Sequence, residues 1–172
     1  NEPGSKSCWV SQIIIHPDWK PFSDKFDADM AVVVLGEEIE YSSFIQPVCL
    51  PPESEAERTG SGTVVGWGQK NSSVDFYGLI PETPEELEML IRNDNDCYRR
   101  FPRLADISSD RMFCAGYVNE TKGVCFGDSG GGFYSHSMES SSSPSFFSVT
   151  GIVSSSLIDH HLSCDINKYS LY

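Results

Sequence analysis

The apolar residues of this chain occur in short, β-branched runs that glycine and proline separate. The runs Val10–Ile15 and Met30–Leu35 have the length and composition of β-strands. Between them, Pro17 and Pro21 break the backbone into a surface loop. Similar runs predict strands at Thr63–Gly66, Leu87–Ile91, Met112–Ala115 and Phe146–Ser154. Many short strands with Gly/Pro turns between them predict an all-β fold.

Two segments depart from this pattern. Asn93–Phe101 is predicted to be a short helix with Asn93 or Asp94 as its N-cap. His136–Ser145 is rich in serine and is predicted to be a mobile surface loop. The chain has 172 residues, 39% of them hydrophobic, which suits one domain with its own core.

Charge and cysteine content exclude several classes of protein. The formal net charge of −13 argues against a nucleic-acid partner, because phosphate binding needs clustered lysine and arginine. No apolar run is long enough to cross a membrane. Six cysteines without a Cys-x-x-Cys pair favour disulfides over zinc or redox chemistry. Asn71 and Asn119 begin N-glycosylation sequons. We therefore expect an extracellular glycoprotein, and since Asn1–Gly4 is no signal peptide, its beginning is expected outside this chain.

The glycine-rich stretch Gly123–Gly132 contains one serine, Ser129, that is a candidate nucleophile. Ser129 has glycines close on both sides and an acid, Asp128, directly before it. Glycines allow a sharp turn and a close approach of the backbone to a substrate carbonyl. The amides of Gly127 and Ser129 are then able to stabilise a developing oxyanion. This pattern predicts that Ser129 is an acyl-transfer nucleophile.

A second candidate residue, Asp29, stands directly before an apolar strand. We expect that strand to enter the core, where a carboxylate needs a charged or hydrogen-bonding partner. An imidazole N–H is such a partner, and it becomes cationic during catalysis. Asp29 is therefore predicted to orient a catalytic histidine, whereas Asp27 is expected to be solvated.

The pattern Cys-x-Gly-Asp-Ser-Gly-Gly at Cys125–Gly131 resembles the nucleophile loop of chymotrypsin-like serine proteases. The resemblance implies two packed, six-stranded antiparallel barrels with the catalytic cleft between them. Residues 1–50 would be the remainder of the first barrel and 51–172 mostly the second, with the first barrel and the C-terminal helix incomplete. Further blocks follow the family order through nearly the whole chain: Ile15–Trp19, Asp29–Leu35, Gln46–Pro51, Val65–Gly68 and Met112–Gly116.

By this resemblance the protein is a serine endopeptidase that acts on proteins or peptides through an acyl-enzyme on Ser129. Gly127 and Ser129 would form the oxyanion hole, and Asp128 would pair with a new N-terminus freed by zymogen cleavage. No metal or other cofactor is required. The chain also resembles arthropod cascade proteases of the gastrulation-defective and modular serine protease type. That likeness implies a secreted zymogen in a proteolytic cascade.

The family's catalytic histidine has no match in the chain. It precedes the aspartate by roughly 45 residues in the template, so it is expected upstream of this chain, which alone would be inactive. His16 matches a loop position, and His136, His160 and His161 follow the serine in polar stretches. One alternative is an inactive homologue that acts as a binding or cofactor module. A metal protein using His160 and His161 is another, although adjacent histidines lack metal-ligand spacing.

The resemblance also implies disulfides between Cys97 and Cys114 and between Cys125 and Cys164. Cys49 resembles the cysteine that ties the catalytic domain to an upstream propeptide or to regulatory modules. Cys8 would pair either with Cys49 or with a segment outside the chain. Unpaired strand edges in an incomplete barrel are expected to make the isolated chain unstable or prone to aggregation.

The substrate pocket departs from that of trypsin-like members. Gly123 stands where an acid selects arginine or lysine, so a cationic side chain would lack its partner. Ser156 and Ser170 replace wall glycines and are expected to narrow the pocket. We therefore expect a preference for neutral, small-to-medium or apolar P1 residues. The predicted pocket residues are Gly123, Ser154, Ser155, Ser156 and Ser170.

Overall fold

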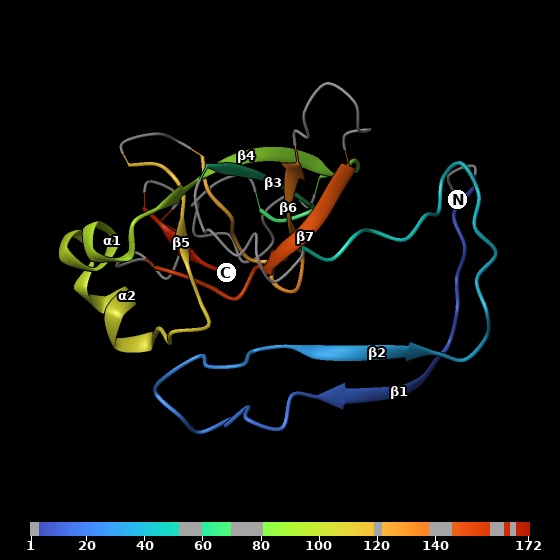
Figure 1. Cartoon of the computed structure of the whole chain (residues 1–172), viewed down its shortest axis with the longest axis horizontal. Coiled ribbons are helices and arrows are strands. Elements are labelled where there is room, and N and C mark those ends of the chain that lie inside the picture. Colours follow the sequence, from blue (N-terminus) through green and yellow to red (C-terminus); the bar gives the residue numbers. More distant parts are fainter. Residues whose placement is uncertain are drawn as a thin grey trace.

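The computed structural model describes residues 4–51, 60–69, 81–118, 122–137, 146–158, 164–165 and 168–172. Within these ranges the named strands form two sheets, and every strand pair is antiparallel (Figure 1). The all-β class predicted from the sequence is confirmed. The elements are β1 (Val10–Ile15), β2 (Ala31–Leu35), β3 (Ser61–Gly66), β4 (Glu85–Arg92), α1 (Asp94–Arg100), α2 (Pro102–Ile107), β5 (Cys114–Ala115), β6 (Gly132–Ser137), β7 (Phe146–Ile152), β8 (Ser155–Ser156) and β9 (Ser170–Leu171).

The larger sheet closes on itself. Its strand order is β7-β6-β3-β4-β5-β9-β8, so β7 and β8 stand at opposite ends of the order. Only Val153 and Ser154 separate these two strands in the sequence, which brings the two ends of the sheet together. Counting β7 and β8 as one bent strand gives the six-stranded barrel that the family resemblance implies.

Most predicted elements are present, with shifted ends. The predicted strand Phe146–Ser154 ends at Ile152 because the chain crosses to β9 there. In α1 the Asn93 side chain accepts a hydrogen bond from the Asn95 amide and caps the helix. Helix α2 was not predicted, although Pro102 suits its first position.

Two segment predictions were wrong. Met112–Ala115 was expected to be a strand throughout, but strand β5 covers only Cys114–Ala115, which pairs with β4 and β9. Phe113 before it exchanges two backbone hydrogen bonds of 3.1 Å with Tyr172. His136 was placed in a mobile loop, yet it belongs to β6, where it pairs with Phe147 of β7. Pairing on both sides makes β6 a strand despite its glycine and serine content. The rest of that predicted loop, residues 138–145, lies outside the described residues.

Two apolar clusters form the core of the larger sheet. One contains Phe113, Phe133 and Tyr172, whose ring centroids lie 4.9 to 5.5 Å apart. The other surrounds the half-cystines Cys97 and Cys114 beneath the two helices. Edge-to-face contacts between buried aromatic rings fix the packing of β5, β6 and β9.

The β1–β2 pair has no core of its own. Every residue of both strands is exposed, and Ile13 and Val32 are each 62% exposed. The expectation that the strand after Asp29 enters the core was therefore wrong. A sheet of two strands has no second layer to bury its faces, and Figure 1 shows β1 and β2 set apart from the larger sheet. We call this pair the β1–β2 ribbon.

Residues 1–172 produced alone should aggregate on heating, because the β1–β2 ribbon exposes both its apolar faces and its edges. Light scattering during a thermal ramp would measure this. Replacing Ile13 and Val32 by threonine should reduce the scattering. Val65→Thr is the matched control, since this valine is also exposed but lies in the larger sheet. A sharp, reversible melt of the unmodified chain would contradict the expectation.

Candidate active site

Ser129 lies on a tight turn between Cys125 and Gly131. The Asp128 amide donates to the Cys125 carbonyl (3.0 Å), and the Gly131 amide donates to the Asp128 carbonyl (2.9 Å). Gly127 has φ +101° and Gly130 has φ +82°, a region that residues with a side chain rarely adopt. The turn leaves Ser129 exposed to solvent.

The amides of Gly127 and Ser129 are open to a ligand. Within the described part of the chain neither amide donates a hydrogen bond to the protein. Both residues are exposed. The two amides predicted to form the oxyanion hole are therefore not engaged by the described residues.

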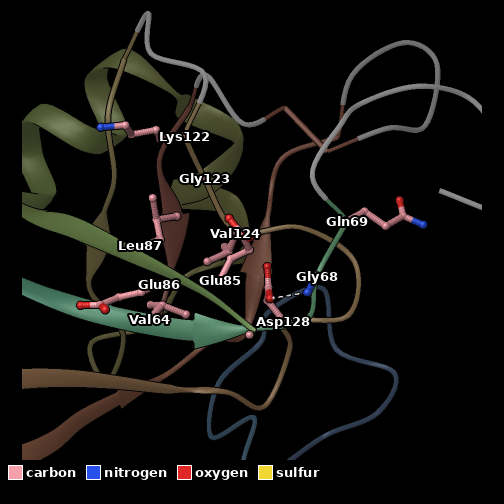
Figure 2. A pocket seen from close by; sticks show the side chains of 11 residues that line it. Val64, Gly68, Gln69, Glu85, Glu86, Leu87, Lys122, Gly123, Val124 and Asp128 are labelled. Atoms are coloured by element: carbon pink, nitrogen blue, oxygen red, sulfur yellow. Dashed lines mark hydrogen bonds between the residues drawn. The ribbon is translucent and has the colours of Figure 1, made fainter. Parts of the chain in front are cut away.

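The Asp128 side chain packs against the end of β3 and is held there by two backbone amides. Its Oδ1 accepts from the Gly68 amide and its Oδ2 from the Cys125 amide, each at 2.9 Å, and Figure 2 shows the first of these bonds. A Cβ on Gly66 or Gly68 would lie 2.1 or 2.2 Å from a carboxylate oxygen. Both positions must therefore be glycine for Asp128 to sit there. The Val65–Gly68 block signalled family membership but not this role.

A cavity of about 340 Å³ adjoins this carboxylate. Gly123 lines it together with Val64, Leu87 and Val124, and Figure 2 shows Asp128 at its edge. Burial raises the pKa of the Tyr172 hydroxyl, and the nearby charge of Asp128 raises it further. Gly123, predicted as a substrate-pocket residue, therefore shares a cavity with the predicted activation residue.

The segment Val153–Ser154 joins the nucleophile turn to Asp29. Val153 exchanges two backbone hydrogen bonds with the turn, from the Gly130 amide (2.9 Å) and to the Gly131 carbonyl (2.8 Å). The next residue, Ser154, donates its hydroxyl to Asp29 Oδ2 at 2.8 Å. Two candidate residues from distant parts of the sequence are thus tied to consecutive residues of one segment. Sequence reasoning placed Ser154 in a pocket wall and missed this bond.

The four predicted pocket serines lie on one short ladder. Ser156 of β8 pairs with Ser170 of β9, and Ser155 pairs with Leu171. The Ser154 amide donates to the Leu171 carbonyl at 3.1 Å. Ser170 is almost fully buried, so its side chain occupies space that a glycine would leave empty.

Two disulfides brace these segments. Cys125–Cys164 fastens the nucleophile turn to the segment before β9, and Cys97–Cys114 fastens α1 to β5. These are the two pairs that the family resemblance implies. Cys8 and Cys49 are not disulfide-bonded, and Cys49 is exposed. The predicted sequons at Asn71 and Asn119 lie outside the described residues.

No described histidine touches either candidate catalytic residue. His16 Nδ1 accepts a hydrogen bond from the Asp18 amide at 3.1 Å, and the ring of His136 packs on Phe147. His160 and His161 lie outside the described residues. The described part of the chain therefore holds the candidate nucleophile and the candidate orienting acid without a general base between them.

Asp27, expected to be solvated, is paired instead. Arg111 donates to both of its carboxylate oxygens, from Nε at 3.0 Å and from Nη2 at 2.8 Å. Nη1 of the same guanidinium donates to Asp18 at 2.6 Å. Hydrogen bonding to Arg111 holds the pKa values of Asp18 and Asp27 below their ordinary value. Arg111 is far from both in sequence, so no local pattern signals this cluster.

The family model for trypsin matches residues 1–171. The chain belongs to the trypsin family. It is 34% identical over 122 residues to mannan-binding lectin serine protease 1 of Rattus norvegicus. Identity to serine protease gd of Drosophila melanogaster is 31% over 136 residues. Identity to the suppressor of tumorigenicity 14 protein homolog of Bos taurus is 32% over 132 residues.

These matches cover 71%, 71% and 76% of this trypsin-family chain, respectively. They cover much less of the relatives, at 16%, 26% and 14% of their lengths. The chain therefore spans about a quarter or less of the length of these relatives. In the described part of the chain, no helix is both long and apolar enough to cross a membrane.

Replacing Gly68 by alanine in the full-length protein should displace the Asp128 carboxylate, because the new Cβ would lie 2.2 Å from its Oδ2. We expect reaction of Ser129 with a fluorophosphonate to slow at least tenfold. Gly60→Ala is the control: Gly60 also has an unusual φ (+91°), but no atom lies within 4 Å of a new Cβ. That control should lose about 1–2 kcal/mol of stability and keep its labelling rate within twofold. Equal labelling rates in both variants would contradict the requirement for glycine at position 68 to place Asp128.

The Arg111 cluster should remain charged and intact from neutral to mildly acidic pH. Folding lowers the pKa values of Asp18 and Asp27. Their contribution to folding stability is therefore complete above the pKa of the unfolded chain, about 3.9. It is lost as pH falls through the lower pKa values of the folded protein. Arg111→Gln should return both midpoints to about 3.9. Carboxyl-carbon NMR titration would measure them, and unchanged midpoints in the variant would count against the pairing.

Proposed function

We propose that this protein is a serine endopeptidase in which Ser129 attacks the carbonyl carbon of a peptide bond. The observation that carries the proposal is the Val153–Ser154 segment, which hydrogen-bonds the turn bearing Ser129 and also Asp29. A nucleophile and an orienting acid bound to one segment are two of the three groups that this acyl transfer requires, the third being a general base. Membership of the trypsin family agrees with this chemistry.

In the proposed reaction a histidine takes the proton of the Ser129 hydroxyl as the Oγ–carbon bond forms. Asp29 orients that histidine and stabilises its cationic form. The oxyanion accepts hydrogen bonds from the amides of Gly127 and Ser129. When the tetrahedral intermediate collapses, the carbon–nitrogen bond breaks and the histidine protonates the leaving amine. Water then hydrolyses the acyl-enzyme by the same route. We propose that this histidine comes from outside residues 1–172.

We further propose that Asp128 is the acceptor of an activation ion pair. The carboxylate lies at the edge of a cavity of about 340 Å³, and two backbone amides hold it in place. A new N-terminal ammonium entering that cavity would find a fixed negative charge. Such an ion pair would suit a zymogen, and the two disulfides suit an oxidising, extracellular compartment. We propose a secreted zymogen that acts within a proteolytic cascade. The exposed thiol of Cys49 would join an upstream propeptide or regulatory module.

The proposed substrates are proteins with a neutral, small-to-medium or apolar P1 residue. Gly123 supplies no charge. Ser170 is buried and pairs with Ser156 on the strands that would form the pocket wall, so their side chains would narrow the pocket. Position 123 itself offers a lysine or arginine side chain no carboxylate to replace its lost solvation.

One observation favours a second candidate function. No described histidine contacts Asp29 or Ser129. A homologue that lacks the base would lose nearly all activity, because triad members act as a unit. Such a protein would use the same scaffold to bind partners.

A fluorophosphonate probe separates these two functions. The full-length protein should react at Ser129 only after proteolytic activation, while Ser129→Ala should never react. Ser135→Ala is a matched control, since this serine lies on β6 and bonds to Thr150 instead of facing the turn. Absence of labelling after complete cleavage would reject the endopeptidase and favour the binding module.

A further inference from the structure

The segment that carries Asp29 is attached to the larger sheet at a few points. It is the connection between β1 and β2, residues 16–30. The Phe26 amide donates to the Ile107 carbonyl at 2.9 Å, and the Phe26 side chain packs against the cluster around Cys97–Cys114. Beyond this, Ser154 holds Asp29 and Arg111 holds Asp18 and Asp27. Because the β1–β2 ribbon itself is exposed, these contacts set where Asp29 lies.

Arg111 uses its whole guanidinium for this attachment. Nε and Nη2 form a parallel pair with the two oxygens of Asp27, while Nη1 reaches Asp18. A planar guanidinium that binds a carboxylate through two parallel bonds fixes its orientation as well as its distance. Asp18 follows β1 and Asp27 precedes β2, so one side chain ties both ends of the connection to the loop before β5.

The backbone at Ala28, between Asp27 and Asp29, has an unfavourable conformation that neighbouring contacts must stabilise. Ala28 has φ +55°, the left-handed region that residues with a side chain avoid, and it is buried. Such a conformation persists where surrounding contacts over-determine it. Here Arg111 fixes the residue before Ala28 and Ser154 fixes the residue after it.

We propose that Arg111 is a positioning residue that sets the place of Asp29 relative to Ser129. Arg111 binds Asp27, the residue before the strained Ala28. Asp29, the residue after Ala28, accepts a hydrogen bond from Ser154 beside the nucleophile turn. This inference rests on the proposed role of Asp29 as the acid that orients the histidine.

A positioning role differs measurably from a stabilising one. The side chains of Arg111 and Asp27 are 48% and 34% exposed, and ion pairs this exposed contribute little to stability. Loss of the pair should therefore change the rate much more than the melting temperature. Arg111 lines a cavity of about 320 Å³ with Asp29 and Ser154. It is not part of the paired strands β8 and β9 that carry the other predicted pocket serines, so we expect KM to change little.

The test compares variants of the full-length, activated protein on one peptide substrate. Arg111→Gln and Asp27→Asn should each lower kcat at least tenfold with KM within twofold. Arg111→Lys keeps the charge but not the parallel pair, so it should recover less than a third of the lost rate. Arg99→Gln is the matched control, because Arg99 forms an exposed ion pair with Asp96 on α1. It should leave kcat and KM unchanged. Wild-type kcat in Arg111→Gln, or full recovery by lysine, would overturn the proposal.

Hydrogen–deuterium exchange supplies a readout that does not depend on activity. In Arg111→Gln the peptide covering residues 27–30 should exchange at least tenfold faster, while Arg99→Gln should match the wild type. Unchanged exchange in Arg111→Gln overturns the positioning role even if the enzyme is active. An unreactive wild type in which exchange still responds to Arg111→Gln rejects the endopeptidase alone. Should Arg111→Gln fail to fold, Asp18→Ala removes only one of the three hydrogen bonds and should show the same changes at smaller size.

Discussion

The backbone pairing between Val153 and the glycines after Ser129 is the contact on which the candidate site depends. Through it, the end of β7 fixes the nucleophile turn, and the adjoining Ser154 reaches Asp29. The same two residues carry the chain from one end of the larger sheet to the other, so the segment that closes the barrel also connects the parts of the candidate site. A barrel that failed to close would leave Ser129 and Asp29 on unconnected segments.

Local sequence signals predicted the parts of the fold that local forces decide. β-branched runs located β1, β2 and β7, and asparagine at position 93 located the start of α1. Glycines around Ser129 predicted a turn with unusual backbone angles, and Gly127 and Gly130 have them. β6 escaped prediction because its glycine and serine residues have weak strand propensity. Only pairing with β3 and β7 makes it a strand.

The contacts that bring the candidate site together were beyond local reasoning. Arg111 is far in sequence from Asp27, and Gly68 is far from Asp128, so neither pairing has a periodic signature. Its place directly before an apolar run singled out Asp29 from Asp27, but only the tertiary structure shows that Asp27 meets a guanidinium and Asp29 a hydroxyl. The exposure of β2 was missed because an apolar run indicates a tendency to be buried and cannot show whether a second layer covers it.

Ser154 connects the strands that carry the candidate pocket serines with the candidate orienting acid, Asp29. Its amide belongs to the ladder that carries the candidate pocket serines, whereas its hydroxyl belongs to Asp29. A substitution at this position would remove the hydroxyl that bonds Asp29 and leave the backbone amide in the ladder. Ser156 and Ser170 face each other across the same ladder without contacting Asp29. Ser156 and Ser170 are therefore replaceable without loss of a hydrogen bond to Asp29, whereas Ser154 is not.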